Sequence, residues 1–563
     1  MKIGRQTFLT SVMIATLTLT AANRVPDPPV HITIDVDAAK TSGRLPPTWS
    51  YFGYDEPNFT YSANGKKLLR ELGRLSPVPV YLRTHNLLTS GDGTGSLKWG
   101  STNAYTQDAE GRPFYSWTIL DRIFDAYAEA GVRPLVEIGF MPEALSTGSP
   151  PYRHDFPRSF ATGWSYPPKD YAKWAELVFQ FAKHLRERYG DPAVNTWLWE
   201  VWNEPDIFYW HGTPEEYFKL YDISANALRQ AVPRARVGGP DSTGPGSERA
   251  AGFLRKFLAH CAHEKNYATN KTGAPLDFIS FHPKGSPEWV DGHVRMGMAQ
   301  QLRAIDAGFK IVASFPEWRN TPIILGENDP EGCAACSAKE RPQNGYRNGS
   351  LYASYTVVAW YSAMALANED GVKLEGSVTW AFQFDGQPYF EGLRELATNG
   401  IDKPILNAFR MLGFMGETRL TVTSSATIPA REIAEKGVRE RPHVDAIAAR
   451  KENEVEVLIV NYQDDDTPLD DAVVDLIVKG LPATTKRLLV EQYRIDATHS
   501  NSCTTWKQIG EPQQPTIEQY NQLEAAGQLQ MTGSPEWVDV ADGVVHRSFS
   551  QPGEGLSLVR FRW

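Results

Sequence analysis

Cysteine is scarce in this chain, which contains four among 563 residues. Cys261, Cys333, Cys336 and Cys503 allow at most two bridges, so a disulfide-dense scaffold is excluded. Cys333 and Cys336 form a Cys-x-x-Cys pair, but no thioredoxin-like strand and helix pattern surrounds it. One such pair is also too few for a tetrahedral zinc module. A short structural disulfide and two free thiols both stay open for this pair.

Positive charge is also in short supply, because the formal net charge is −10 at pH 7. No basic patch interleaved with aromatic residues is present, and no long low-complexity or like-charge tract occurs. A polyanion-binding surface needs an excess of lysine and arginine on one face. We therefore expect no nucleic-acid partner.

The chain lacks an apolar run long enough for a membrane span. The stretch from Phe8 to Leu19 falls short of the roughly 20 apolar residues that a span requires. Lys2 and Arg5 precede this stretch and small residues follow it, which predicts a signal peptide over residues 1–23. We expect a secreted or periplasmic protein that is free of the membrane after signal removal. The oligomeric state is left open.

From Thr48 to Met415 short β-branched runs alternate with longer amphipathic runs, the pattern of a parallel sheet built from βα units. The eight candidate strands are Trp49 to Tyr54, Val78 to Thr84, Pro134 to Phe140, Thr196 to Trp202, Arg236 to Gly239, Phe278 to Phe281, Pro322 to Leu325 and Gly376 to Phe382. The helical runs between them are Trp117 to Ala130, Pro168 to Tyr189, Pro214 to Ala231, Ser247 to His263, Gly292 to Phe315 and Gly345 to Glu369. This count predicts an α/β fold with a (β/α)8 TIM barrel over residues 44–416. A doubly wound open sheet is the alternative, but no Gly-rich phosphate fingerprint follows any early strand.

Beyond Glu417 the pattern changes to alternating strands without long helices, which predicts a C-terminal β-sandwich domain over residues 417–563. One helical insertion, Ile517 to Gly527, interrupts these strands. The run Val30 to Val36 alternates in the same way. We expect this N-terminal segment, residues 24–43, to pair with the sandwich.

Two acidic residues follow strands that a barrel can place across its mouth from each other. Glu204 lies in Trp202-Asn203-Glu204-Pro205 after the fourth predicted strand, and Glu327 follows the seventh. In a TIM barrel the functional side chains lie at the carboxyl ends of the strands. Retaining cleavage of a glycosidic bond needs two carboxyl groups about 5–5.5 Å apart, one to attack and one to protonate the leaving oxygen. An isolated rim carboxylate is more often part of a salt bridge, but this pair predicts a glycosidase.

Further side chains follow other predicted strands and extend the candidate substrate site. They are His85 after the second strand, His282 and Lys284 after the sixth, and Trp380 at the end of the eighth. Singly, a histidine is more often a core group and a tryptophan more often packing, yet together at strand ends they favour substrate binding. The chain has no His-x-His motif and too few clustered ligands for a metal-dependent hydrolase. We therefore expect no metal and no cofactor.

At these residues the sequence resembles glycoside hydrolase family 39, the group that contains β-xylosidases and α-L-iduronidases. The segment 202–205 is similar to the acid/base motif of that family, and the likeness runs through most of the chain. The resemblance implies that Glu204 is the general acid/base and Glu327 the nucleophile. It also implies that Asn203 is a partner of the sugar 2-hydroxyl.

Several stretches resemble the α-L-iduronidase branch more than the xylosidases, among them 83–85, 237–240, 277–285 and 327–330. Lys284 matches a lysine that binds the substrate carboxylate in that branch, and an ammonium suits a uronate or a hydroxyl. The segment 383–392 departs from the iduronidase pattern, so a substrate role for Asp385 is carried over only as an expectation.

Together these observations predict a retaining, exo-acting glycoside hydrolase that removes a terminal xylose-like or uronic-acid sugar from an oligosaccharide or glycoside. The alternative is a catalytically inactive carbohydrate-binding protein on the same fold, although such a protein has little reason to keep both Glu204 and Glu327. The sequence decides neither the glycone nor the linkage.

Overall fold

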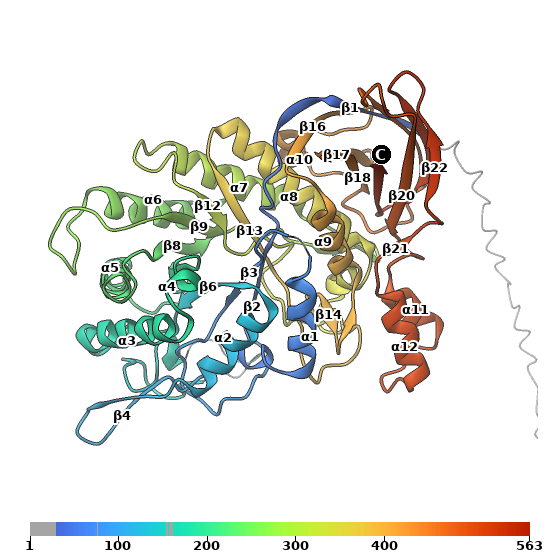
Figure 1. The fold of residues 1–563 in the computed structure, drawn as a ribbon. Helices are drawn as coiled ribbons and strands as arrows, with labels where there is room; N and C mark the ends of the chain where they lie inside the picture. The colour runs from blue at the N-terminus through green and yellow to red at the C-terminus, as the bar shows by residue number, and fades with distance from the viewer. Residues whose placement is uncertain (1–29, 76, 154–155, 157–161) are drawn as a thin grey trace, which may run out of the picture.

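A computed structural model describes residues 30–75, 77–153, 156 and 162–563 of the chain. The expected signal peptide, residues 1–23, lies outside these described residues. No helix in the described ranges is long and apolar enough to cross a membrane. Figure 1 shows two assemblies, a barrel ringed by helices and a sheet built mainly from the last part of the chain.

The first assembly is a closed parallel barrel of eight strands in the order β12-β13-β2-β3-β6-β7-β8-β9. Its strands are β2 (Tyr51–Tyr54), β3 (Tyr81–Thr84), β6 (Arg133–Ile138), β7 (Leu198–Val201), β8 (Arg236–Thr243), β9 (Phe278–His282), β12 (Ile323–Leu325) and β13 (Leu374–Trp380). Each strand overlaps one of the eight predicted from the sequence. The predicted TIM barrel is therefore confirmed.

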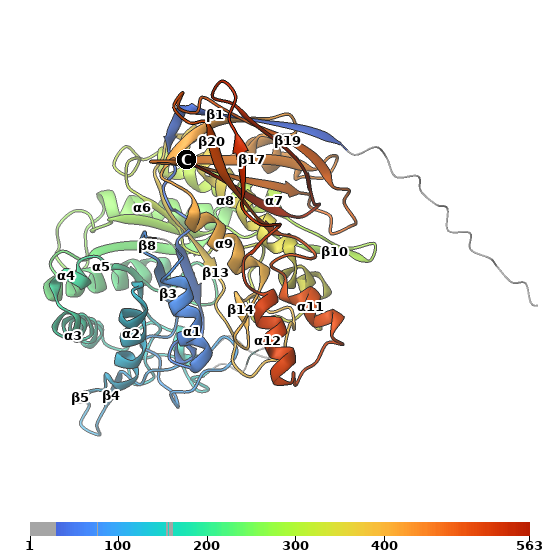
Figure 2. The same ribbon diagram turned by 45° about the vertical axis from the view of Figure 1, so that its right-hand side comes forward.

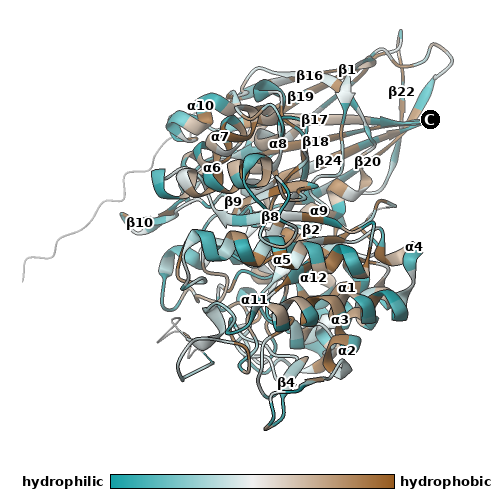
Figure 3. Cartoon of the chain, turned by 90° about the vertical axis from the view of Figure 1, so that its left-hand side faces the viewer, coloured by the Kyte–Doolittle hydropathy of each residue, from teal (hydrophilic) through white to brown (hydrophobic). Residues whose placement is uncertain are grey.

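Long helices cover the outside of the barrel, and half of them begin at a Ser, Thr or Asp whose side chain accepts a hydrogen bond from a backbone N–H of the first turn. They are α1 (Ala63–Leu72), α2 (Thr118–Ala130), α3 (Tyr171–Tyr189), α5 (Pro214–Ala231), α6 (Glu248–His263), α7 (Met298–Ala313), α8 (Ser350–Asp370) and α9 (Pro404–Phe414). α5 begins at a capping box in which Thr213 and Glu216 satisfy each other's backbone N–H groups. In Figure 3 the helices α1, α3 and α5 carry both hydrophilic and hydrophobic residues, as expected for helices with one face on a barrel.

The predicted helix over Gly292 to Phe315 begins too early, because α7 starts only at Met298. The preceding residues form a hairpin of β10 (Glu288–Val290) and β11 (His293–Arg295). Asp291 and Gly292 join the two strands with φ angles of 50° and 86°. A two-residue Asp-Gly loop with positive φ favours a tight hairpin over a helix start.

The second assembly is a ten-stranded, mostly antiparallel sheet. In order it contains β21 (Gln530–Met531), β20 (Arg487–Ile495), β24 (Leu556–Arg562), β18 (Glu454–Tyr462), β17 (His443–Lys451), β16 (Thr418–Ser424), β1 (His31–Arg44), β19 (Ala472–Lys479) and β23 (Val545–Gln551), with β22 (Glu536–Asp539) on β20. β1 lies between β16, to which it is antiparallel, and β19, to which it is parallel. Alternate residues such as Ile34, Val457 and Leu476 meet in one apolar cluster. The domain boundaries at 43/44 and 416/417 stay predictions.

Shorter elements complete the described chain. They are β4 (Tyr105–Gln107), β5 (Pro113–Tyr115), β14 (Ala397–Thr398), β15 (Ile401–Asp402), α4 (Asp191–Val194), α10 (Ala430–Lys436), α11 (Ser502–Gln508), α12 (Ile517–Ala526), and the 3-10 helices Pro57–Phe59, Gly163–Ser165 and Pro342–Asn348. Figure 2 shows α11 and α12 beside β14, on the barrel side of the second sheet. There Phe390 and Ile401 of the barrel pack against Cys503, Trp506 and Leu523. The loop that follows β13 is thereby held by the other assembly.

Candidate active site

The two acids predicted as a catalytic pair meet at the carboxyl end of the barrel. Glu204 follows β7 and Glu327 follows β12. One carboxylate oxygen from each lies within 4.8 Å of the other and of a ring nitrogen of His282. This separation is near the roughly 5–5.5 Å between carboxyl groups in retaining glycosidases and below the roughly 6.5–9.5 Å of inverting ones.

Glu327 is a buried carboxylate surrounded by cations. The Lys284 ammonium lies 2.6 Å from its Oε2, and an Arg83 Nη lies 3.3 Å from its Oε1. Nε2 of His85 is 3.5 Å from the same Oε1. Burial opposes ionisation, but Lys284, His282, His85 and Arg83 outweigh it and hold the pKa of Glu327 well below its usual range. Glu327 is therefore ionised, as an attacking carboxylate must be.

Glu204 is more accessible than Glu327 and is oriented by the loop after β7. Its side chain is 14% exposed and its Oε1 lies 3.0 Å from Nδ1 of His282. Its backbone N–H donates to the Asp241 carbonyl oxygen at 2.9 Å. Both Trp202 and Glu204 have positive φ angles, 73° and 43°, which non-glycine residues adopt mainly where the surrounding structure requires it.

His282 links Glu204 to the buried acids below. Its Nε2 lies 2.9 Å from Oδ2 of Asp241. Burial opposes the imidazolium, but Asp241 and Glu327 raise the pKa of His282 to about 10. The ring is therefore protonated near neutral pH, so its Nδ1–H donates to Glu204 and its Nε2 forms an ion pair with Asp241.

Arg83, on β3, is the centre of a buried network that the sequence did not reveal. The side chain is fully buried, forms ion pairs with Glu137, Asp241 and Glu327, and donates to Glu200. Burial, against the effect of Arg83, raises the pKa of Glu200 well above its usual range. Glu200 is therefore held protonated, which reduces the charge that the one guanidinium must balance.

The other predicted binding residues on the β3, β7 and β13 ends lie around this network. Asn203 Oδ1 accepts a hydrogen bond from Arg83 at 3.0 Å. The Trp380 ring packs against the Arg83 guanidinium, whose Cζ lies 4.8 Å from the ring centroid. It also packs against the His85 ring, with 4.3 Å between the two centroids. Its indole N–H donates to Oδ2 of Asp55 at 3.1 Å. The structure therefore brings Asn203, Trp380 and His85 together with the carboxylate pair.

Asp385 is the predicted site residue that the structure does not bring to the pair. Its Oδ1 accepts a hydrogen bond from Asn64 at 3.2 Å, and the described residues include no hydrogen bond from it to Glu204 or Glu327. Instead it lines a hollow of about 650 Å³ together with Phe59, Arg153 and Gln387. These residues lie in the segments that follow β2, β6 and β13.

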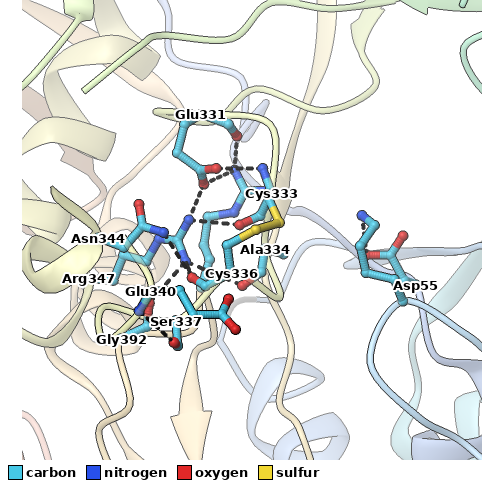
Figure 4. Close-up of a disulfide and its surroundings, with 12 residues drawn as sticks. Asp55, Glu331, Cys333, Ala334, Cys336, Ser337, Glu340, Asn344, Arg347 and Gly392 are labelled. Carbon is cyan, nitrogen blue, oxygen red and sulfur yellow. Dashed lines mark hydrogen bonds and ion pairs between the residues drawn. A yellow bond between two sulfur atoms is a disulfide. The ribbon is translucent and has the colours of Figure 1, made fainter. Parts of the chain in front are cut away.

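A small disulfide loop fixes the segment that follows Glu327, as Figure 4 shows. Cys333 and Cys336 are bridged, while Cys261 and Cys503 are free and buried. The buried Arg347 donates to the carbonyl oxygens of Cys333 and Cys336, each at 2.8 Å, and pairs with Glu331. A guanidinium that donates hydrogen bonds to several carbonyl oxygens at once holds this loop in one conformation.

Glu204, His282 and Glu327 are close enough to share a cation. A metal ion there requires a neutral histidine, whereas the pKa of His282 is raised to about 10 because Asp241 and Glu327 outweigh its burial. It also has to displace the Lys284 ammonium from Glu327. The donor set therefore fits a proton-transfer site better than a metal site.

Comparison with known proteins agrees with this geometry. The family model for glycosyl hydrolases family 39 matches residues 32–537. A β-xylosidase from Caldicellulosiruptor saccharolyticus is 29% identical over 431 residues, which cover 74% of this chain and 77% of that one. The human α-L-iduronidase is 28% identical over 391 residues, covering 63% of this chain and 55% of that one. The structure of a monomeric β-xylosidase from Caulobacter crescentus CB15 superposes with a TM-score of 0.73 at 21% identity, covering 94% of this chain and 99% of that one. This chain is a glycosidase and belongs to glycosyl hydrolases family 39.

Proposed function

We propose that this enzyme is a retaining, exo-acting glycosidase that removes a terminal xylose-like or uronic-acid sugar by double displacement. The observation that carries the proposal is the approach of the Glu204 and Glu327 oxygens to within 4.8 Å of one another. The two related enzymes named as a β-xylosidase and an α-L-iduronidase support this choice of sugars.

In the first step, the ionised Glu327 attacks the anomeric carbon while Glu204 transfers its proton to the leaving oxygen. The bond to the aglycone breaks and a covalent ester forms between the sugar and Glu327. Esterification removes the negative charge of Glu327. Glu204 has given up its proton and is then the one charged carboxylate of the pair, so it can act as a base.

In the second step, Glu204 takes a proton from a water molecule whose oxygen attacks the anomeric carbon. The ester bond breaks, Glu327 regains its charge, and Glu204 is protonated again, now by the proton of the attacking water. Two inversions at the anomeric carbon give net retention. His282 donates to Glu204 and so orients the carboxyl group in both steps.

Lys284 is the candidate group for recognising an acidic sugar. Its side chain is 16% exposed, so it lies at the edge of the buried network. Its ammonium bridges Glu327 and Asp329 at 2.6 Å each and has one further N–H donor. A uronate carboxylate is a suitable acceptor for that donor, and a neutral hydroxyl is the alternative.

Chemical rescue tests the proposal. We expect Glu327→Ala to lose turnover of aryl glycosides, and azide to restore it with a glycosyl azide of inverted configuration, because the small anion replaces the missing nucleophile. Exposed Glu340→Ala is the matched control and should keep wild-type activity. Full activity in Glu327→Ala contradicts the assigned nucleophile. Sugar binding by a wild-type protein that cleaves none of these glycosides favours the inactive binding protein.

A further inference from the structure

A buried lysine that the sequence did not single out reaches the active site from the loop between β3 and α2. Lys98 is 8% exposed, and its ammonium lies 3.3 Å from Oδ2 of Asp55. Asp55 follows β2 directly and is also buried. Burial disfavours the ammonium, but Asp55, with Tyr209 and Glu327, raises the pKa of Lys98. Lys98 therefore keeps its charge inside the protein.

Asp55 connects this ammonium to the catalytic centre. Its Oδ1 lies 3.6 Å from Nε2 of His85, and the same nitrogen lies 3.5 Å from Oε1 of Glu327. Its Oδ2 also accepts from the Trp380 indole. One carboxylate and one imidazole thus separate Lys98 from Glu327, and the Asp55 carboxylate that pairs with the ammonium also lies against Trp380 and His85.

The loop that carries Lys98 is held firmly in place. The Lys98 backbone N–H donates to Oε1 of Glu56, and its φ angle of 56° is uncommon for a lysine. Asn58 and the backbone of Ser101 exchange two hydrogen bonds of 2.9 Å. A side chain held this way is positioned before any ligand arrives, which favours a binding role.

We propose that Lys98 and Asp55 together bind the neighbouring 3- and 4-hydroxyls of the terminal sugar, the ammonium donating and the carboxylate accepting. An ammonium has three donors, and Asp55 is its single acceptor in the part of the chain that the structure describes. Each sugar hydroxyl both donates and accepts, so a donor beside an acceptor complements two adjacent hydroxyls. The 2-hydroxyl is the group that the resemblance gives to Asn203. This inference rests on the proposed exo-glycosidase function and deepens it by naming what recognises the non-reducing end.

Deoxy substrates test the inference. The aryl glycoside that the wild type prefers is compared with its 3-deoxy and 4-deoxy forms, and kcat/KM is measured for each. The quantity compared is the kcat/KM of the parent glycoside divided by the kcat/KM of a deoxy form. In the wild type this ratio should be about 10 to 100 for the hydroxyl that accepts from Lys98, because a hydrogen bond to a charged group is lost. In Lys98→Met the ratio should fall to about 1–3, because the partner of that hydroxyl is already gone.

The comparison uses ratios within one variant, so the fraction of folded enzyme cancels and a poorly folding Lys98→Met stays informative. Lys98→Arg keeps the charge and should retain most of the wild-type ratio. Lys66→Met removes an exposed ammonium that pairs with Glu129 on the outer helices, and it should leave the ratio unchanged.

Two results overturn the inference: a wild type that does not discriminate against either deoxy form, or a Lys98→Met variant that discriminates as strongly as the wild type. Azide rescue of Glu327→Ala decides the proposed function independently. If azide rescues Glu327→Ala but the deoxy comparison fails, the proposed function stands and only the binding role of Lys98 and Asp55 is contradicted.

Discussion

The ammonium of Lys284 lies 2.6 Å from Oε2 of Glu327, and it lies equally close to Oδ2 of Asp329. The side chain therefore has two separable effects. It stabilises the charge of the Glu327 carboxylate, which we propose as the nucleophile, and it offers its remaining donor at the edge of the buried network. Different measurements on the same substitution distinguish these effects.

The first effect predicts a change in pH dependence. Burial raises the pKa of Glu327 and Lys284 is the largest influence that lowers it, so Lys284→Met should raise that pKa. Glu327 is then protonated at a higher pH, and the acid limb of kcat/KM moves to higher pH. A pH profile on a neutral aryl glycoside measures this shift. Lys310→Met, which removes an exposed ammonium on α7, is the control. An acid limb that stays in place in Lys284→Met contradicts the assigned electrostatics.

The second effect predicts a change in substrate preference. If the natural glycone is a uronate, Lys284→Met should raise KM for aryl uronides by about 10-fold or more, because a charge-assisted hydrogen bond is lost. KM for aryl pentosides should change much less. Wild-type and variant enzymes are assayed on both substrates at one pH. Similar changes for the two substrates remove the carboxylate role and favour a neutral sugar.

The acid role of Glu204 predicts a dependence on the leaving group. Glu204→Ala should lower kcat/KM by about 10²- to 10⁴-fold for poor leaving groups, which need a proton as the bond breaks. Activated aryl glycosides leave without that proton, so their first step should be much less affected. A series of aryl glycosides with graded leaving-group pKa measures the difference as a slope. Equal losses across the series count against Glu204 as the acid.

The Arg83 network predicts a large stability effect. Arg83→Met leaves several buried carboxylates without their shared cation, so we expect the free energy of unfolding to fall by about 3–5 kcal/mol. Chemical denaturation of the variant and the wild type measures this loss. Arg112→Met removes an exposed arginine that also pairs with two acids, and it should not change unfolding measurably. A similar result for both variants means that the buried network contributes little.

The sequence was sufficient for the barrel and for the position of the acid pair. Few folds accommodate β-branched strands that alternate with amphipathic helices. Because functional side chains of a TIM barrel lie at the carboxyl ends of its strands, Glu204 and Glu327 could then be selected. The β10–β11 hairpin was mistaken for the start of a helix because the apolar spacing was given more weight than Asp291-Gly292.

The buried charges were missed although a signal for them exists. Arg83, Glu137 and Glu200 each lie inside a predicted barrel strand, where a charge has to find a partner in the interior. Glu137 and Glu200 are register partners on β6 and β7. Lys98 had no such signal, because it lies in a loop whose path depends on contacts with Glu56 and Asn58.

The place of β1 in the second sheet has a consequence for biogenesis. Thr33 bonds to Ser425, 392 positions later, and the strand fills the gap between β16 and β19. Because the chain is synthesised from its amino terminus, β1 is made before β16 and β19 and stays unpaired with them until both have been synthesised. Until it inserts, β16 and β19 present open edges that invite pairing with other molecules. The first strand of the chain therefore has to stay available for pairing until residues more than 400 positions later have been made.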